Sequence, residues 1–431
     1  MAVNATAVWR VRPGGSNTNG GGYDPGISGA ATDYSKQNSA QASGTHGTTV
    51  GTTSFVDATA NAFTSAMVGN AIYITGSGQT TGWYFVTAFS SASTVTLDRS
   101  PGTGTLATWN LGGGWADPFT NLDTTTNVLV PGNIVYVLGS GTPNPSAYTP
   151  DYTYGGGGAF PLVNGNTTAG SVDILNDPAT PGYKAPPDTT GGMPVVKIPN
   201  PFVTGAYSNF AGLYFVGTTG GASSGAVISS PTSSTVVFGC VFDQLSQDIS
   251  FTNGFCAVLG CEVFTSTAPG AGAWQGLRLN AIGAIAASCN IHDTNGPGVL
   301  VASGAQIINS IISKCQGIGV NMVDTSTNVM RCFDCTIDGN TGNGIEISSQ
   351  NALASSFVAN NIISNHTTGG KFGLTVDAGT AAQNNLVQLF VDYNVYYNNA
   401  ADLNAISYGP HDTHGGANPY VGQATENYTL A

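Results

Sequence analysis

Apolar and polar positions alternate in short runs that recur through the second half of the chain. One four-residue phrase recurs there: a glycine, an apolar residue, a variable residue and a second apolar residue. It begins at Gly276, Gly298, Gly319, Gly344 and Gly373. Successive glycines are separated by 22, 21, 25 and 29 residues. Alternation with period two predicts a strand with one buried face. Its recurrence at this spacing predicts a coil that buries the face by stacking on its neighbours.

A second apolar phrase keeps the same spacing and defines another strand of each repeat. It starts at Cys240, Cys261, Cys289, Ser310, Cys335, Asn361 and Asn394. Two strands per repeat, joined by turn residues, predict a right-handed parallel β-helix over residues 116–431, ending in a closing cap. The first apolar position of each glycine phrase should then be buried in one sheet. These positions are Leu277, Val299, Val320, Ile345 and Leu374.

Two further regions precede the repeats. Residues 49–115 contain short apolar strands separated by Gly, Ser and Thr turns, which predicts a small β-barrel or sandwich domain. Residues 1–48 contain a long polar, glycine-rich stretch without a period. Such a stretch cannot bury enough apolar surface alone, so we expect an extended N-terminal arm that becomes ordered on a partner. Val8, Trp9 and Val11 would be its apolar anchor.

Composition supports an all-β protein and limits the classes of partner. The chain has 60 glycines in 431 residues, and only 8% of its residues are charged. This profile is typical of short strands joined by tight turns. The formal net charge is −13, and the ten Lys and Arg residues are scattered singly, which argues against nucleic acid and anionic membranes as partners. Any assembly must therefore depend on apolar and hydrogen-bonded contacts.

No segment has the pattern of a targeting or membrane-spanning element. Residues 1–12 alternate like a strand and lack a charged start followed by an apolar stretch. No run approaches the roughly 18 apolar residues of a membrane helix. We therefore expect synthesis in a cytoplasm and no insertion into a membrane.

The seven cysteines are predicted to be structural. Four of them share one register of the repeats, namely Cys240, Cys261, Cys289 and Cys335. Neighbouring strands lie about 4.8 Å apart, whereas disulfides require Cβ atoms about 3.5–4.5 Å apart, so we expect a ladder of buried thiols. Cys332 and Cys335 resemble a CxxC motif, but residues three apart in a strand point to opposite faces. We therefore expect neither a metal site nor a cofactor.

Several phrases resemble those of a known group of proteins. They are Trp9–Pro25, Asp33–Ser35, Val68–Arg99, Asn418–Val421 and Tyr428–Leu430. These phrases are similar to those of right-handed β-helix proteins from tailed bacteriophages. The resemblance implies a virion protein that is made in the host cytoplasm and forms a homotrimer. Pectate lyases, tailspike glycosidases, epimerases, adhesins and inert virion proteins share the fold, so the fold does not decide the activity.

An enzymatic role would require paired acids on the outer face of the coil. Glycoside hydrolysis uses two carboxylates about 5–9.5 Å apart. The outer positions of the glycine phrases are Arg278, Leu300, Asn321, Glu346 and Thr375. Glu346 is the one acid among them, so its candidate partners are the turn residues Asp293, Asp324 and Asp334. Elimination chemistry would need a carboxylate cage for calcium and a cationic base, and no Asp-rich run exists.

Histidines offer two further candidates. His411 and His414 flank Asp412, and this phrase fits either a metal site or, as we favour, a polar turn near the end of the coil. His292 and Asp293 are predicted to form a hydrogen-bonded turn, because no nucleophile elbow accompanies them.

These patterns together favour a non-enzymatic structural protein of a phage virion. It would be a capsid decoration, such as a head spike, or a tail-associated protein, attached through its N-terminal region with the β-helix projecting outward. Its partners would be other capsid or tail proteins. The alternative is a phage tailspike that binds or hydrolyses a glycan of the host surface. A secreted polysaccharide lyase is less favoured, because cations are scarce and no signal peptide is recognised.

Overall fold

The computed structural model is an all-β chain that divides into two compact units. It describes residues 4–116, 128–141, 150–153, 159–160, 168, 170–186, 188–198, 203–204, 207–217, 228–230, 234–243, 249–251, 255–264, 276–324, 328–349, 355–377, 388–422 and 427–430. The first unit comprises residues 1–185, 190–197 and 205–214, and the second comprises residues 186–189, 198–204 and 215–431. Among the described residues, helix is limited to two single 3-10 turns, η1 (Tyr34–Lys36) and η2 (Ser65–Met67), and none could cross a membrane.

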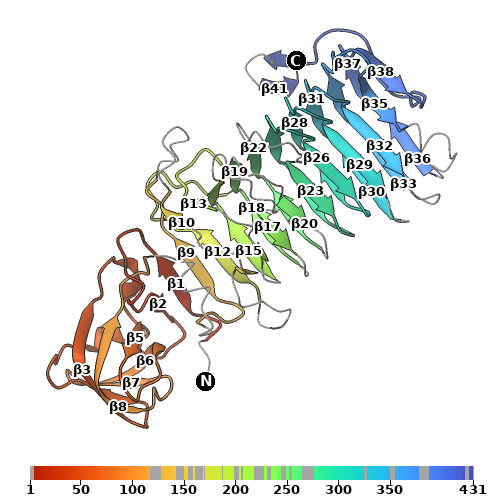
Figure 1. Ribbon diagram of the computed structural model, residues 1–431. Coiled ribbons are helices and arrows are strands. Elements are labelled where there is room, and N and C mark those ends of the chain that lie inside the picture. Colours follow the sequence, from red (N-terminus) through yellow and green to blue (C-terminus); the bar gives the residue numbers. More distant parts are fainter. Residues whose placement is uncertain are drawn as a thin grey trace. The chain divides into compact units, whose positions relative to one another are not determined.

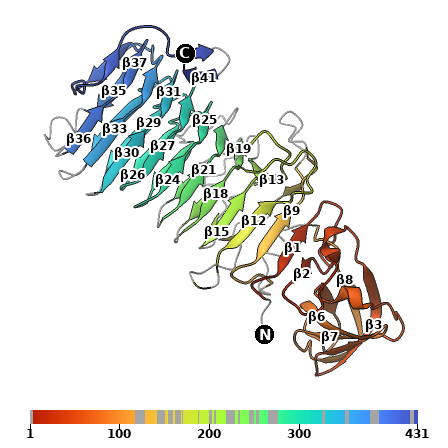
Figure 2. The ribbon, with the colours of Figure 1, turned by 180° about the vertical axis from the view of Figure 1, so that it is seen from behind.

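The second unit is a parallel β-helix, as the sequence predicts (Figure 1). Each coil passes through three sheets, which we number I to III in chain order. Sheet I contains β18 (Val236–Phe238), β21 (Ala257–Leu259), β24 (Ile285–Ala287), β27 (Gln306–Ile308), β30 (Val329–Phe333), β33 (Ser355–Ala359) and β36 (Gln388–Asp392). The labels of Figure 2 show these strands side by side.

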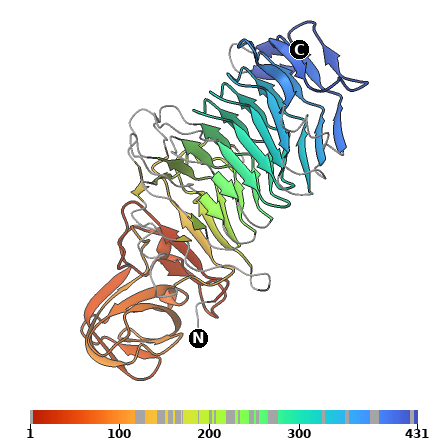
Figure 3. The ribbon, with the colours of Figure 1, turned by 45° about the vertical axis from the view of Figure 1, so that its right-hand side comes forward.

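Sheets II and III complete each coil, and Figure 3 shows the successive coils stacked on one another. Sheet II contains β16 (Tyr214–Val216), β19 (Val241–Asp243), β22 (Glu262–Phe264), β25 (Asn290–His292), β28 (Ile311–Ser313), β31 (Thr336–Asp338), β34 (Ile362–Ser364), β37 (Val395–Tyr397) and β39 (Thr413–His414). Sheet III contains β14 (Val203–Thr204), β17 (Ile228–Ser230), β20 (Ile249–Phe251), β23 (Leu277–Asn280), β26 (Val299–Ala302), β29 (Val320–Asp324), β32 (Ile345–Ser349), β35 (Phe372–Val376) and β38 (Ala401–Asn404).

The interior of the coil is formed by one apolar row from each sheet. In sheet III the row consists of Leu277, Val299, Val320, Ile345 and Leu374, which pair in this order and are fully buried. The predicted stacking is therefore confirmed. Successive coils approach closely beside this row: a Cβ atom on Gly298 would lie 2.9 Å from the carbonyl oxygen of Gly319. The glycine of each phrase is thus required by contact with the next coil.

The corners of the coil explain the polar residues between strands. Between sheets I and II, one residue of each coil has a positive φ angle: Gly239, Gly260, Ser288, Asn309, Asp334, Asn360 and Tyr393. Gly and Asn tolerate this left-handed conformation best. The next residue points inward and accepts a backbone hydrogen bond from the preceding coil, as from Cys289 N–H to Ser310 Oγ (3.1 Å) and from Cys335 N–H to Asn361 Oδ1 (3.0 Å).

All seven cysteines are buried in the coil. Burial raises the pKa of Cys315 to about 11, which keeps this thiol protonated and unreactive. The expectation that Cys332 and Cys335 point to opposite faces is wrong, because both are buried. Asp334 between them has a φ angle of 56°, so the chain turns a corner there and the alternation of a straight strand does not apply.

In the first unit, a barrel is inserted between two paired strands. β1 (Val8–Val11) pairs in parallel with β9 (Ile134–Val137) and antiparallel with β2 (Gly22–Tyr23). β9 continues to β12 (Val172–Asn176) and β15 (Ser208–Ala211). The short strands β10 (Tyr152–Thr153) and β13 (Val195–Lys197) pair separately, and the unit also contains β11 (Ala159–Phe160).

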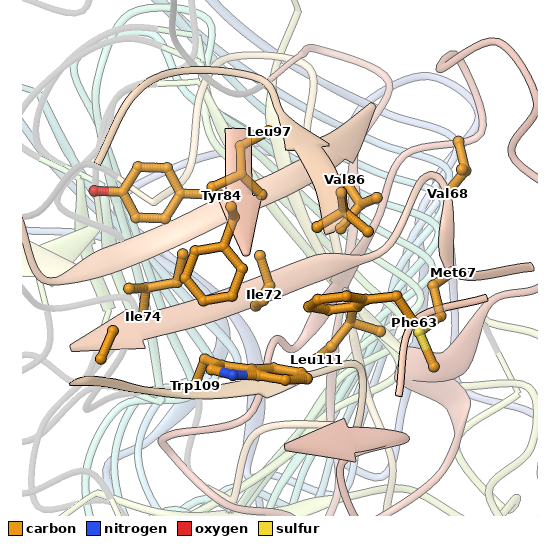
Figure 4. Packing of buried hydrophobic residues seen from close by; sticks show 13 residues of the cluster. Phe63, Met67, Val68, Ile72, Ile74, Tyr84, Val86, Leu97, Trp109 and Leu111 are labelled. Atoms are coloured by element: carbon orange, nitrogen blue, oxygen red, sulfur yellow. The ribbon is translucent and has the colours of Figure 1, made fainter. Parts of the chain in front are cut away.

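The closed barrel has the strand order β3 (Ala42–Val50), β4 (Ser54–Val56), β7 (Thr94–Leu97), β6 (Gly82–Ser91), β5 (Ala71–Thr75) and β8 (Thr103–Leu111). Its core is centred on aromatic rings (Figure 4). Phe63 stacks on Trp109 at 4.8 Å between ring centroids, and the Trp109 indole donates a 2.9 Å hydrogen bond to Asp57 Oδ2. Burial of these apolar side chains is the main stabilising contribution to the barrel.

The N-terminal segment differs from the extended arm that was expected for residues 1–48. Trp9 and Val11 are fully buried, and Val8 is partly buried in the same strand. The Trp9 ring stacks on Trp115 at 4.7 Å, and its indole donates a 3.1 Å hydrogen bond to Asn133 Oδ1. The barrel also begins at Ala42, inside the expected arm. The apolar side chains of β1 are therefore used within the chain and are not available to a partner.

The C-terminus differs from the closing strands that the sequence suggested. β40 (Tyr420–Gly422) and β41 (Asn427–Leu430) form a separate antiparallel hairpin. The Tyr420 hydroxyl lies 2.8 Å from Ser364 Oγ, and the Tyr428 hydroxyl donates to Asp338 Oδ2 at 3.3 Å. The hairpin therefore lies against the outer side of sheet II.

Candidate functional site

Glu346 lies on the outer side of sheet III, as the sequence predicts. It is partly buried in β32, and its Oε2 accepts a 2.8 Å hydrogen bond from Asn343 Nδ2. Its neighbours in register are Asn321 on β29 and Thr375 on β35. Neither neighbour is acidic, so this row presents a single carboxylate rather than the pair that hydrolysis requires.

The proposed partners of Glu346 lie elsewhere. Asp334 is at the corner between β30 of sheet I and β31 of sheet II. Asp293 follows β25 of sheet II and belongs to a coil two turns before the coil of Glu346. Asp324 ends β29 and pairs with Ser349, and its side chain is outside the described residues. The described contacts therefore bring none of these aspartates to Glu346.

Sheet II carries a charged cluster that sequence reasoning found only in part. His292 Nδ1 lies 2.8 Å from Asp293 Oδ2, as the predicted turn requires, and Nε2 lies 3.3 Å from Glu262 Oε1 on the preceding coil. Burial lowers the pKa of His292, but the two carboxylates raise it above its ordinary value overall. Both ring nitrogens lie beside carboxylates, so the cluster offers no free base. Alignment of the repeats could have found Glu262, because its strand β22 pairs with β25, the strand of His292.

His411 and His414 do not converge on a common point. His411 stacks on Tyr393 at 4.5 Å, and His414 stacks on Tyr408 at 4.7 Å. Within the described part of the chain, no group of three His, Cys, Asp or Glu side chains could hold a metal ion.

The most distinctive outer surface of the second unit is that of sheet I. Its outer side has two rows of residues that pair in register from coil to coil. The first row is Val236, Ala257, Ile285, Gln306, Arg331, Phe357 and Phe390, and the second is Phe238, Leu259, Ala287, Ile308, Phe333, Ala359 and Asp392. Eleven of these fourteen positions are apolar. We call this surface the sheet I face.

The sheet I face is accessible as well as apolar. Most of its side chains are partly exposed, and Phe390 at its end is 44% exposed. Phe357 contacts Phe333 and Phe390 at 6.5 and 5.6 Å between ring centroids, which makes a continuous aromatic patch. The corresponding row of sheet III contains one large apolar residue, Leu300, between Arg278 and Asn321, and Glu346 follows. Single exposed apolar residues are common on proteins, so the continuity of this strip is what makes it a candidate interaction surface.

Comparisons with known proteins give a likeness of fold and no assignment of activity. No family model and no curated protein matches the sequence. Pectate lyase Pel9A is similar in structure at 13% identity and a TM-score of 0.44, over 70% of this chain and 78% of that chain. The Dettilon tailspike protein is similar at 16% identity and a TM-score of 0.41, over 62% of this chain and 53% of the tailspike chain. Function therefore has to be argued from the residues of this chain.

Proposed function

We propose that this chain is a structural protein of a tailed-bacteriophage virion, either a capsid decoration or a tail-associated protein, and that it forms a homotrimer through the sheet I face. The similarity of its N-terminal and closing phrases to phage β-helix proteins supports the virion role. The observation that carries the assembly is the sheet I face, a continuous apolar strip whose burial against another copy would be stabilising.

The occupant of this face is a second copy of the chain. The net charge of −13 makes copies repel one another wherever acids face each other. On the sheet I face the one acid is Asp392, which is buried at the end of the strip, and the one cation is Arg331. Rungs about 4.8 Å apart also match a surface of the same period, which an identical coil supplies.

The size of the strip fits the centre of such an interface. Seven strands at about 4.8 Å and two rows of side chains give a strip of roughly 29 by 12 Å, or about 350 Å². A stable interface buries about 800 Å² on each partner, with an apolar centre and a polar rim. The exposed corner residues beside the sheet, such as Ser288, Asn309 and Asn360, would supply part of the polar rim.

Attachment to the particle is assigned to the barrel of the first unit. Trp9 and Val11 are buried and cannot serve as the anchor. Val50 on β3 and Leu106 on β8 are exposed apolar residues of two paired strands. These residues replace the N-terminal apolar residues as the proposed contact with other virion proteins.

Mass measurement tests the assembly. In size-exclusion chromatography with light scattering, the wild-type protein should have three times the mass of the 43.6 kDa chain. Ile308→Glu places a charge in the centre of the sheet I face and should give a monomer with unchanged circular dichroism. Leu300→Glu, on the outer row of sheet III, is the matched control and should remain trimeric. A wild-type monomer, or a trimer in both Ile308→Glu and Phe333→Glu, would refute the interface.

Location is tested separately. Mass spectrometry of gradient-purified virions should detect the chain in a copy number that is a multiple of three. Purified virions without the chain would refute the virion role, whatever the oligomeric state of the isolated protein.

A further inference from the structure

An unusual tyrosine stands at the corner of the last complete coil. Tyr393 has a φ angle of 61°, in the left-handed region. The same corner of the six preceding coils is occupied by Gly239, Gly260, Ser288, Asn309, Asp334 and Asn360. A bulky side chain is unfavourable in this conformation. Such strain persists where the surroundings enforce it, and it is concentrated at functional sites.

The Tyr393 ring packs against one neighbouring ring and is otherwise accessible to solvent. The ring stacks on His411 with an interplanar angle of 4°, and Tyr393 is 51% exposed. His411 is fixed in turn by Asp392, whose carboxylate accepts hydrogen bonds from His411 Nδ1 (2.8 Å) and from its backbone N–H (2.7 Å). The Tyr393 backbone N–H also donates to Asp392 Oδ1 at 2.9 Å. One buried carboxylate therefore orients the whole stack.

The arrangement leaves an oriented hydrogen-bond acceptor beside the exposed ring. Because His411 Nδ1–H donates to Asp392, the neutral imidazole carries its lone pair on Nε2. The His411 side chain is 55% exposed, and its Nε2 bonds no described residue. A ring face with an acceptor at its edge is suited to a ligand that has both a flat C–H surface and hydroxyl donors.

A second pair repeats this design on the same segment. Tyr408 is exposed and stacks on His414 at 4.7 Å with an interplanar angle of 18°. The Tyr408 hydroxyl donates to Asp402 Oδ2 at 3.1 Å, which fixes the ring. Two stacked Tyr–His pairs therefore belong to one segment of the chain, residues 393–414.

We propose that the Tyr393–His411 stack, with Tyr408–His414 as a second contact, is a binding site for a neutral saccharide. One face of a sugar ring would lie on Tyr393, and a sugar hydroxyl would donate to His411 Nε2. The carboxylates of Asp392, Asp402 and Asp412 and the net charge of −13 repel anionic ligands, which favours an uncharged glycan. This site goes beyond assembly, and the one residue that it shares with the sheet I face is Asp392.

Saturation-transfer NMR and calorimetry on the full-length protein test the site. The probes are neutral hexasaccharides of glucose, mannose, galactose and N-acetylglucosamine, a hexauronate as the anionic arm, and a tetralysine peptide as the cationic arm. At least one neutral hexasaccharide should bind, with contacts to its ring C–H protons. Failure of every neutral probe, or preference for the hexauronate or the peptide, would overturn the proposal.

Tyr393→Asn is the decisive variant, because Asn fits the left-handed corner that Asn309 and Asn360 occupy in other coils. It should fold, melt at the same or a higher temperature than the wild type, and lose at least tenfold in saccharide affinity. Tyr393→Phe keeps the ring and should bind within twofold of the wild type. Phe255→Asn removes an exposed aromatic ring elsewhere on the coil and should have no effect. Unchanged affinity in Tyr393→Asn would refute the site, and Ile308→Glu should bind normally even as a monomer.

Discussion

His366 should make the stability of the coil depend on pH. It is fully buried at a corner between sheets II and III. Its Nδ1 lies 3.0 Å from Asn399 Oδ1, and its Nε2 lies 3.3 Å from Asn340 Nδ2. The neutral ring satisfies both contacts when Nδ1–H donates to Asn399 and Nε2 accepts from Asn340. A proton on Nε2 would face the N–H donor of Asn340, so the folded coil disfavours the charged form of His366.

The sign and size of the effect follow from the pKa. Burial lowers the pKa of His366 from 6.5 to about 4, against smaller raising effects of the Asn399 hydrogen bond and the Asp338 charge. Below pH 6.5 the unfolded chain binds a proton that the folded chain excludes. The stability due to the neutral ring is therefore complete above pH 6.5 and is lost as the pH falls towards 4, by about 3 kcal/mol in all.

His366→Gln isolates this contribution, because the amide keeps a donor and an acceptor but does not titrate. The free energy of unfolding would be measured from urea titrations, followed by circular dichroism, at pH 7.5 and pH 4.5. The 23 acidic residues titrate in both proteins, so the informative quantity is the difference between wild type and variant. Between the two pH values the wild type should lose about 2.5 kcal/mol more than His366→Gln.

His46→Gln provides the control. His46 is an exposed histidine on β3 of the barrel, and its replacement should leave the pH dependence of the wild type intact. If His366→Gln and the wild type lose the same free energy on acidification, the buried ring is not the proton-excluding group and the reasoning fails.

Two further substitutions examine the contact between coils and the candidate acid. Gly298→Ala would put a Cβ atom 2.6 Å from Ile312 Cγ2 and should destabilise the coil by about 2 kcal/mol, whereas Gly369→Ala, with open space around its position, should be neutral in the same urea titration. Glu346→Gln should leave the stability unchanged. Neither the wild type nor this variant should release new reducing ends from host surface polysaccharide. Turnover by the wild type that Glu346→Gln abolishes would contradict the single-carboxylate geometry.

Much of the coil could be predicted because its strands obey a local rule. In sheet III, phrases such as Leu277–Leu279 and Ile345–Ile347 alternate strictly, so the buried row can be read from sequence order alone. The corners could not be predicted in this way. Cys332 and Cys335 both point inward because Asp334 adopts a left-handed conformation between them, and period-two alternation does not continue through such a residue.

The fold of the N-terminal segment could not be predicted for a different reason. Residues 8–11 alternate like a strand, but the strand that pairs with them is Ile134–Val137, which follows the whole barrel in the sequence. A polar stretch after β1 suggested an arm, because local composition gives no sign of a partner strand more than 120 residues away. The His292 cluster also depends on a contact that is distant in sequence. Glu262 is 30 residues from His292 and becomes its neighbour only when the coils are stacked.

The sheet I face does have a signal in the sequence, of a kind that differs from alternation. Its strands contain continuous apolar runs, such as Val236–Phe238, Ile285–Ala287 and Ile307–Ile308. In sheet III, β23, β29 and β32 instead place a polar residue between two apolar ones, and β26 is the exception. A continuous run is typical of a strand that is covered on both faces. The interior of the coil covers one face of sheet I. The other face remains partly exposed in the single chain. A second copy on this face would bury it, as the continuous apolar runs of its strands predict.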